Sequence, residues 1–445
     1  MKKVIVVHAI DTEGPLYESL DSKFDRINEL VGKLQIKRTE KNFQKILSGK
    51  TKISKNKLKK ITDMFSSHLN NYNDDWNKID KMVEKLMSKD FRTTYSLNKS
   101  HWKFTWFCLD HLNYDYNPRR RTLGHHSIYD YYKSIVEDYN YGDDIQWHFH
   151  PATIHNDAHY CSSFYFRTPI IYEILTRKIL ERNFFPSCYR AGCQTERPDS
   201  NWFLEQWIPF DISNMAMKNK KDFEKYIDFK NGRGGNWKNA PNDWTIYHPN
   251  HDDYQKIGNS RRWIGRALNV LNRVGSINQA EVDNAFAKTK KNNSPILLGV
   301  ASHDWRNIEY EVSHVFNLIK KSSLKYPDVN IEFCNVNEAF KKVLWPNGIK
   351  EKQIKLKIKF NKKTKNDVAN ILIEAKQGEV FGPQPFLAIK TKSRKFIYDN
   401  LDFIAKNKWG YAFYENTILL DEISELAVAA NDKYGNTSIE KIKFK

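Results

Sequence analysis

Cysteine is scarce in this 445-residue chain and gives no framework of cross-links. The five cysteines are odd in number and lack the paired spacing of zinc fingers. They are Cys108, Cys161, Cys188, Cys193 and Cys334. This usage excludes a disulfide-stapled secreted scaffold and suits a reducing compartment.

Long apolar runs are also missing. No stretch approaches the roughly 20 apolar residues that a bilayer-spanning helix needs, so we expect no membrane segment. The basic start, Met1 to Lys3, is followed by only seven residues before Asp11, and this apolar run is too short for the core of a signal peptide. We therefore expect a cytoplasmic protein whose first apolar run is a β-strand.

Acidic residues are outnumbered, with 53 Asp and Glu against 72 Lys and Arg, a formal net charge of +19. Such an excess suits a nucleic-acid or acidic-glycan partner, but it also suits a solvated, lysine-rich surface. The lysines are spread along the chain, with short clusters such as 350–365, and we find no RNA-recognition, helix-turn-helix or zinc-finger signature. The solvated surface is favoured, and nucleic acid is the minority alternative.

Hydrophobic periodicity predicts an α/β protein of two domains. Stripes at helical spacing predict a helical insert at about residues 20–95, with N-caps at Ser54 and Asn73. Apolar runs that alternate with helical stretches predict parallel βα units in a (β/α) barrel domain over residues 1–347. Beyond it, apolar residues alternate with lysines and predict a small antiparallel β-sandwich over residues 350–445. The last strands of this sandwich resemble the end of immunoglobulin-like modules.

Three apolar runs end in groups suited to catalysis. They lead to Asp11 and Glu13, to His148 and His150, and to His303 and Asp304. Because residues two apart on a strand project to the same side, the members of the first two pairs face one site. One carboxylate and two imidazoles can hold a divalent cation with positions open for water and substrate. A second carboxylate can take the proton of the water, and a further histidine can protonate the leaving group.

Each group also has a structural interpretation. Glu13 before Gly-Pro suits a turn, and His148 and His150 suit hydrogen-bonded core positions. The His303–Asp304 pair suits the cap of a following helix, and Arg190 suits a structural ion pair. The site is favoured because the groups occur in pairs at the ends of predicted strands.

The order of these motifs resembles the polysaccharide deacetylases with a NodB-homology domain, carbohydrate esterase family 4. The resemblance covers about residues 1–345 apart from the insert. Its motifs are Asp11 to Pro15, Ile145 to Pro151, Tyr189 to Gly192, Trp202 to Asp211, and Leu297 to His303. It implies a distorted (β/α) barrel of about seven strands and metal-dependent removal of N- or O-acetyl groups from sugars. It also implies a base at Asp11, a base-orienting Arg190, an acid at His303, and metal ligands at Glu13, His148 and His150.

The chain departs from the family pattern at two ligands. The family's histidines are four residues apart and its metal carboxylate is an aspartate, whereas here the histidines are two apart and the carboxylate would be Glu13. We expect zinc, with cobalt, nickel or manganese as alternatives. We expect Asp304, Trp147, Trp305 and Asp211 to hold the ligands in place or to bind substrate. Trp237 and Trp244 are further candidates to stack on sugar rings, and His155 and His159 are expected to be surface or second-shell groups.

The expected function is metal-dependent deacetylation of a carbohydrate or a sugar-containing precursor, in surface polysaccharide biosynthesis. One alternative is hydrolysis of a non-sugar amide C–N bond on the same fold. The other is a non-catalytic glycan-binding protein that uses the sandwich and exposed aromatic side chains.

Overall fold

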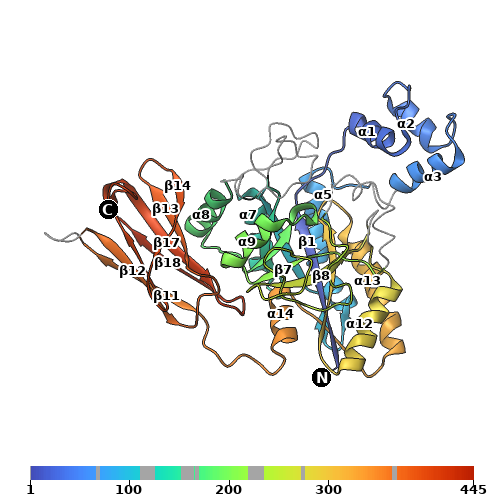
Figure 1. Cartoon of the computed structure of the whole chain (residues 1–445). Coiled ribbons are helices and arrows are strands. Elements are labelled where there is room, and N and C mark those ends of the chain that lie inside the picture. Colours follow the sequence, from blue (N-terminus) through green and yellow to red (C-terminus); the bar gives the residue numbers. More distant parts are fainter. Residues whose placement is uncertain are drawn as a thin grey trace.

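The computed structural model describes residues 2–66, 71–110, 126–151, 165, 170–218, 235–271, 276–362 and 368–444. Figure 1 shows an α/β barrel between a group of N-terminal helices and a C-terminal antiparallel domain. None of the described helices has the length and apolar content to cross a membrane.

Seven parallel strands close into a barrel, which confirms the predicted (β/α) barrel. They pair in the order β1, β4, β5, β6, β7, β8 and β9, and β9 returns to pair with β1. Their bounds are Lys3–Thr12, Phe104–Asp110, Asp144–Phe149, Cys188–Ala191, Phe210–Asn214, Trp263–Asn269 and Ile296–His303. An eighth strand, β10 (Asn330–Phe333), pairs only with the first half of β1, over Lys3 to Val6.

The strand register brings distant parts of the sequence together at the carboxyl end of the barrel. Asp11 pairs with His303 across β1 and β9, and His148 pairs with Arg190 across β5 and β6. Alternate side chains of each strand point inward. On β1, for example, Ile5, Val7 and Ala9 line an apolar interior. Asp11 follows in the same alternation, so its carboxylate faces the mouth of the barrel.

Helices cover the outside of the barrel. They are α7 (Ser127–Tyr139), α8 (Ile170–Arg182), α9 (Pro198–Trp207), α12 (Gln279–Asn292), α13 (Ile308–Lys325) and α14 (Val336–Leu344). The last of them closes the amino-terminal end, where Phe340 stacks on Phe210 at a centroid distance of 4.5 Å. The interior is therefore a packed core, and only the opposite end is free to form a site.

The helical insert consists of two parts. Helices α1 (Leu20–Val31), α2 (Glu40–Leu47) and α3 (Lys55–Met64) share a small core of their own, built around Phe24, Ile27, Phe43 and Ile46. Helices α5 (Trp76–Leu86) and α6 (Lys89–Thr94) instead join the main apolar core of the barrel. A two-residue hairpin, β2 (Ser96–Leu97) with β3 (Ser100–His101), follows them.

One predicted N-cap of the insert is correct and the other is wrong. Ser54 is the N-cap of α3, although its side chain makes no capping hydrogen bond. The N-cap of α5 is Asp75, whose carboxylate accepts from the backbone N–H of Lys78. The Asn73 amide instead donates to the carbonyl oxygens of Asp304 and Arg306, because the chain re-enters the barrel there.

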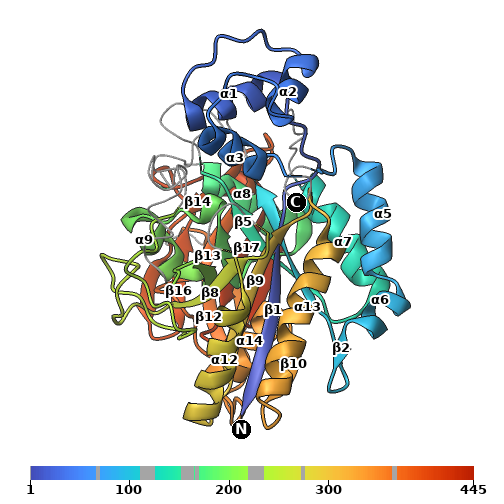
Figure 2. The ribbon, with the colours of Figure 1, turned by 90° about the vertical axis from the view of Figure 1, so that its right-hand side faces the viewer.

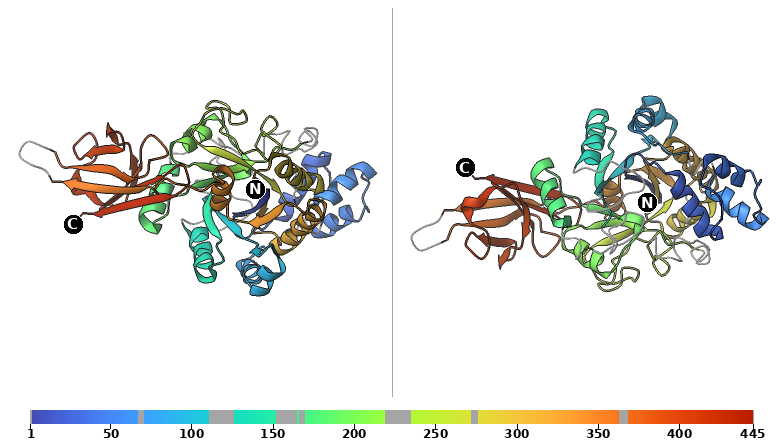
Figure 3. Two further views of the ribbon diagram at one scale, coloured as in Figure 1. Left: turned by 90° about the horizontal axis from the view of Figure 1, so that it is seen from below. Right: turned by 90° about the horizontal axis from the view of Figure 1, so that it is seen from above.

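The C-terminal segment forms two antiparallel four-stranded sheets that face each other across an apolar core. One sheet contains β11 (Lys355–Asn361), β12 (Asn370–Gln377), β16 (Lys408–Ala412) and β15 (Asp402–Ala405). The other contains β14 (Phe396–Asp399), β13 (Phe386–Thr391), β17 (Ile423–Asn431) and β18 (Thr437–Lys443). Figure 3 shows this sandwich on one side of the barrel and helices α1 to α3 on the other.

The second sheet packs against α8, and this contact fixes the sandwich to the barrel. Tyr172 stacks on Tyr398 at 4.8 Å, and the Asn431 amide donates to the carbonyl oxygens of Pro186 and Trp207. Gly435 has a φ of +74°, in the left-handed region that favours glycine. A Cβ added at this position would lie 2.5 Å from the Phe210 ring. The two domains are therefore closely fitted.

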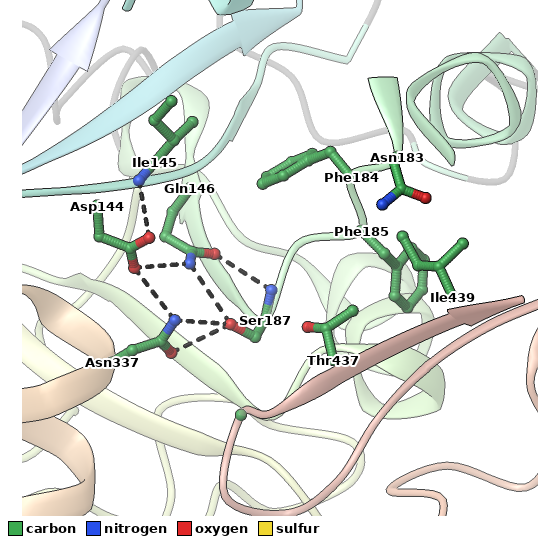
Figure 4. Close-up of a pocket in the computed structure, with 11 residues that line it drawn as sticks. Asp144, Ile145, Gln146, Asn183, Phe184, Phe185, Ser187, Asn337, Thr437 and Ile439 are labelled. Carbon is green, nitrogen blue, oxygen red and sulfur yellow. Dashed lines mark hydrogen bonds between the residues drawn. The ribbon is translucent and has the colours of Figure 1, made fainter. Parts of the chain in front are cut away.

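A pocket of about 310 Å³ lies in this junction, beside the amino-terminal ends of β5 and β6. Figure 4 shows its polar wall, where Asp144 accepts from the amides of Gln146 and Asn337, and Ser187 bonds to Asn337. The hydrogen bonds of these polar groups are made to one another. The residues that line the pocket therefore join the two domains, at the end of the barrel opposite the carboxyl ends of the strands.

Candidate metal centre

Three predicted ligands converge at the mouth of the barrel. Glu13 follows β1, His148 lies on β5, and His150 follows β5 directly. Oε1 of Glu13 lies 3.5 Å from Nε2 of each histidine, and the two Nε2 atoms lie 3.0 Å apart. Tetrahedral coordination with bonds of about 2.0–2.1 Å separates ligand atoms by about 3.4 Å. The three groups therefore fit one divalent ion.

The tautomer of His148 also suits ligation. Its Nδ1 lies 2.8 Å from the carbonyl oxygen of Arg190. A carbonyl can only accept, so Nδ1 carries the proton and Nε2 keeps its lone pair for a metal. His148 is fully buried, so this orientation is fixed by packing as well as by the hydrogen bond.

His150 is held by a residue that the sequence analysis did not include in the site. Cys193 follows β6 in a short 3₁₀ turn, η1 (Gly192–Gln194), and its thiol hydrogen-bonds to His150. Burial lowers the pKa of His150, but Cys193 and Glu13 outweigh it and raise the pKa to about 9. A Cβ at position 192 would lie 2.5 Å from Cδ2 of His150, so glycine there allows the turn to approach the imidazole.

Asp11 and Arg190 form a fully buried ion pair beside the three ligands. Nε of Arg190 donates to Oδ1 of Asp11 at 2.7 Å, and Nη1 donates to the carbonyl oxygen of Ile212 at 2.9 Å. Both side chains are 0% exposed. Oδ2 of Asp11 has no hydrogen-bond partner among the described residues. Arg190 therefore fixes the carboxylate with one oxygen left for another group.

His303 ends β9 on the other side of Asp11. Its Nε2 lies 3.7 Å from Oδ2 of Asp11, and its ring packs on Trp305 at a centroid distance of 4.5 Å. Burial lowers the pKa of His303 to about 4, although the carboxylates of Asp11 and Glu13 oppose that shift. The imidazole is therefore neutral near pH 7.

Asp304 and Trp305 hold Glu13. The Asp304 carboxylate accepts from the backbone N–H groups of Glu13 and Gly14, each at 2.9 Å, and from the hydroxyl of Tyr132. Burial raises the pKa of Asp304 to about 7. The Trp305 indole donates to Oε2 of Glu13 at 3.1 Å. Asp304 thus orients the Glu13 loop. Trp305, which is 7% exposed, holds the Glu13 carboxylate.

Two other predicted residues lie outside the site. Trp147 faces outward from β5, is 0% exposed, and donates to Asp110. Asp211 faces outward from β7 and binds Arg262, which also pairs with Glu196. Adjacent strand residues point to opposite faces, so Trp147 cannot share the interior with His148.

The other aromatic candidates are packing residues. Trp237 and Trp244 are buried in the main core, and their indoles donate to the carbonyl oxygens of Gln194 and Glu281. They offer no open face for a sugar ring. His155 and His159 lie outside the described residues.

No protein-family model matches the chain, and no curated protein matches it significantly.

Proposed function

We propose that this chain is a metal-dependent hydrolase that removes an N- or O-acetyl group from a carbohydrate. The observation that carries the proposal is the cluster of Glu13, His148 and His150 beside the buried Asp11 carboxylate, whose Oδ2 lacks a hydrogen-bond partner among the described residues. The order of its motifs, which resembles that of the polysaccharide deacetylases, supports a sugar as the acetyl carrier. Zinc is the proposed ion, because one carboxylate and two imidazoles suit it.

The chain's own residues divide the work of hydrolysis. A bound divalent ion would activate water and polarise the acetyl carbonyl. Asp11 is placed to accept the proton of the attacking water at Oδ2, because Arg190 holds its other oxygen. Glu13, kept in place by Asp304 and Trp305, serves as a ligand.

His303 needs a proton before it can act as the acid. The pKa of His303 is about 4, so its imidazole begins neutral. Its Nε2 lies 3.7 Å from Oδ2 of Asp11, the atom that is placed to accept the proton of the water. We propose that the proton passes from the water to Asp11, then to His303, and from there to the departing nitrogen or oxygen. The new C–O bond replaces the broken acyl C–N or C–O bond, and acetate leaves as the second product.

The proposed setting is cytoplasmic synthesis of a surface polysaccharide, with the C-terminal sandwich as an immunoglobulin-like accessory domain. Helix α8 packs against the β14–β13–β17–β18 sheet of the sandwich. The outer face of the other sheet, β11–β12–β16–β15, is open to solvent.

Release of acetate from a panel of acetylated sugars tests the proposal. We expect a chelator to abolish release and zinc or cobalt to restore it. Asp11→Asn should reduce turnover by about 10²–10⁴-fold while the purified protein retains its metal. Asp328→Asn, at an exposed position away from the mouth, is the control.

Other outcomes would assign another function. Full turnover by metal-loaded Asp11→Asn would remove Asp11 as the base. Hydrolysis of linear or cyclic amides, with acetylated sugars untouched, would identify an amide hydrolase. A metal-free protein that binds glycan without turnover would be a glycan-binding protein.

A further inference from the structure

The segment of residues 37–60, which carries helix α2 and the first part of α3, is the most basic surface of the helical insert; the rest of α3 adds one acidic residue, Asp63. We call the segment 37–60 the basic hairpin. It contains one acidic residue, Glu40, and ten basic residues, all exposed: Lys37, Arg38, Lys41, Lys45, Lys50, Lys52, Lys55, Lys57, Lys59 and Lys60. Arg38 pairs with Asp25, and Lys57 donates to the carbonyl oxygen of Val31. The other eight form no ion pair with any described residue.

Folding of the helices does not require this charge. The buried faces of α2 and α3 are apolar, and Phe43, Ile46 and Ile61 pack into the small core with α1. On the exposed side, Lys41 and Lys45 are four residues apart, and so are Lys55 and Lys59. Like charges at this spacing destabilise a helix by about 0.2–0.5 kcal/mol per pair, and a bound polyanion would offset that repulsion.

The basic hairpin is joined to the mouth of the barrel through the stems of the insert. The backbone N–H of Leu16 donates to Asn73, and the N–H of Asn73 donates to the carbonyl oxygen of Trp305, each at 2.9 Å. Tyr72 packs against Trp305 edge-on at 5.4 Å. Figure 2 shows α1 to α3 beyond the end of β1 that carries the metal centre. The insert that carries the hairpin is therefore anchored at the mouth of the barrel.

We infer that the basic hairpin binds an anionic polysaccharide, a polymer with carboxylate or phosphate groups, and presents it to the metal centre. This inference rests on the proposed function and names its substrate class. Charge complementarity supports a polyanion. The hairpin has no exposed aromatic side chain on which bases could stack, because Phe43 is 4% exposed and packs in the core. That favours an acidic glycan over a single-stranded nucleic acid.

Binding by the full-length protein, measured by fluorescence anisotropy against salt, tests the inference. The probes are labelled polygalacturonate for carboxylate and poly(glycerol phosphate) for phosphate, with neutral dextran as the blank. The hairpin variant carries Lys→Gln at Lys41, Lys45, Lys55 and Lys59. The matched control carries the same change at Lys355, Lys357, Lys359 and Lys362 on the sandwich, which removes equal charge on the far side of the barrel.

We expect the hairpin variant to bind at least one acidic polymer about tenfold or more weakly at low salt, with a shallower salt dependence. The control should change by less than about twofold. Equal losses in both variants, or none in either, would overturn the inference. Tighter binding of duplex DNA, single-stranded DNA or phosphatidylserine vesicles than of both polymers would also overturn it.

A parallel assay separates this result from the proposed function. Both lysine variants should release acetate from a small neutral acetylated sugar at the wild-type rate, because neither alters the metal centre. No release by any of the proteins, with hairpin-dependent polymer binding intact, would count against the deacetylase alone. Normal release with no hairpin-dependent binding would count against the polysaccharide alone.

Discussion

Replacement of Arg190 by methionine would leave a carboxylate buried without its partner. Arg190 and Asp11 are both 0% exposed, and one hydrogen bond of 2.7 Å joins them. Two histidine nitrogens, Nδ1 of His148 at 3.8 Å and Nε2 of His303 at 3.7 Å, lie beyond hydrogen-bonding distance of the carboxylate. Loss of one partner of a buried pair costs about 3–5 kcal/mol. We expect Arg190→Met to lower the free energy of unfolding by that amount at neutral pH.

Urea denaturation followed by tryptophan fluorescence measures this loss, in metal-free buffer so that ligand binding does not contribute. The double variant Asp11→Asn/Arg190→Met should be more stable than Arg190→Met, because it buries no charge. Arg182→Met is the matched control, since the Arg182–Asp130 pair is also short, at 2.5 and 2.7 Å, but largely exposed. It should cost at most about 1 kcal/mol. An equally small loss for Arg190→Met, or strictly additive single variants, would refute the reasoning.

Three further perturbations follow from the structure. Cys193→Ala removes the thiol that holds His150 and should raise the zinc dissociation constant about 10–100-fold, whereas Cys334→Ala, remote from the metal centre, should not; an unchanged value in titration calorimetry would exclude the orienting role. Gly435→Ala adds both left-handed strain and a clash with Phe210, so it should destabilise the protein more than Gly348→Ala, which shares the strain at φ +87° but has open space; equal denaturation midpoints would contradict a close-fitted junction. Burial raises the pKa of Glu311 to about 7 from 4.5, so the folded protein holds the extra proton and stability should fall as pH rises from about 4.5 to 7. Glu311→Gln should flatten that fall by up to about 3 kcal/mol in denaturation series at pH 5 and 8, although Asp304 will keep part of the slope, and an unchanged slope would rule out this contribution.

Strand alternation explains which site residues the sequence could predict. Asp11 and Glu13 share a parity, as do His148 and His150, so each pair faces the mouth of the barrel. The same rule excludes Trp147 and Asp211, which sit next to inward-facing His148 and Ile212. The outward direction of these two side chains can thus be predicted from strand alternation. Both faces of β1 and β9 are buried and apolar, so the parity of the site residues, and not an apolar alternation, indicates the interior face.

Other features depend on contacts that no local pattern contains. Cys193 reaches His150 only because β5 and β6 are neighbours and Gly192 allows the turn to approach. The Asp304 carboxylate accepts from the backbone N–H groups of Glu13 and Gly14, which lie 291 and 290 positions away in the sequence. The capping role expected for Asn73 fails for a similar reason, since its amide is used to tie the insert to the barrel. In each case a tertiary hydrogen bond overrides a local preference.

The long side chain of Glu13 and the close spacing of the two histidines act together at the candidate metal centre. Glu13 leaves β1, whereas both histidines come from the end of β5, and β4 lies between these strands. Two strand spacings amount to about 9–10 Å, so the carboxylate and the imidazoles must span that distance between them. Histidines two residues apart are confined to one strand end, which keeps both imidazoles on the far side of that gap. The longer arm of glutamate then supplies the reach, and its Oε1 meets both Nε2 atoms at 3.5 Å. A short histidine spacing and a long carboxylate are therefore parts of one solution to the same geometry.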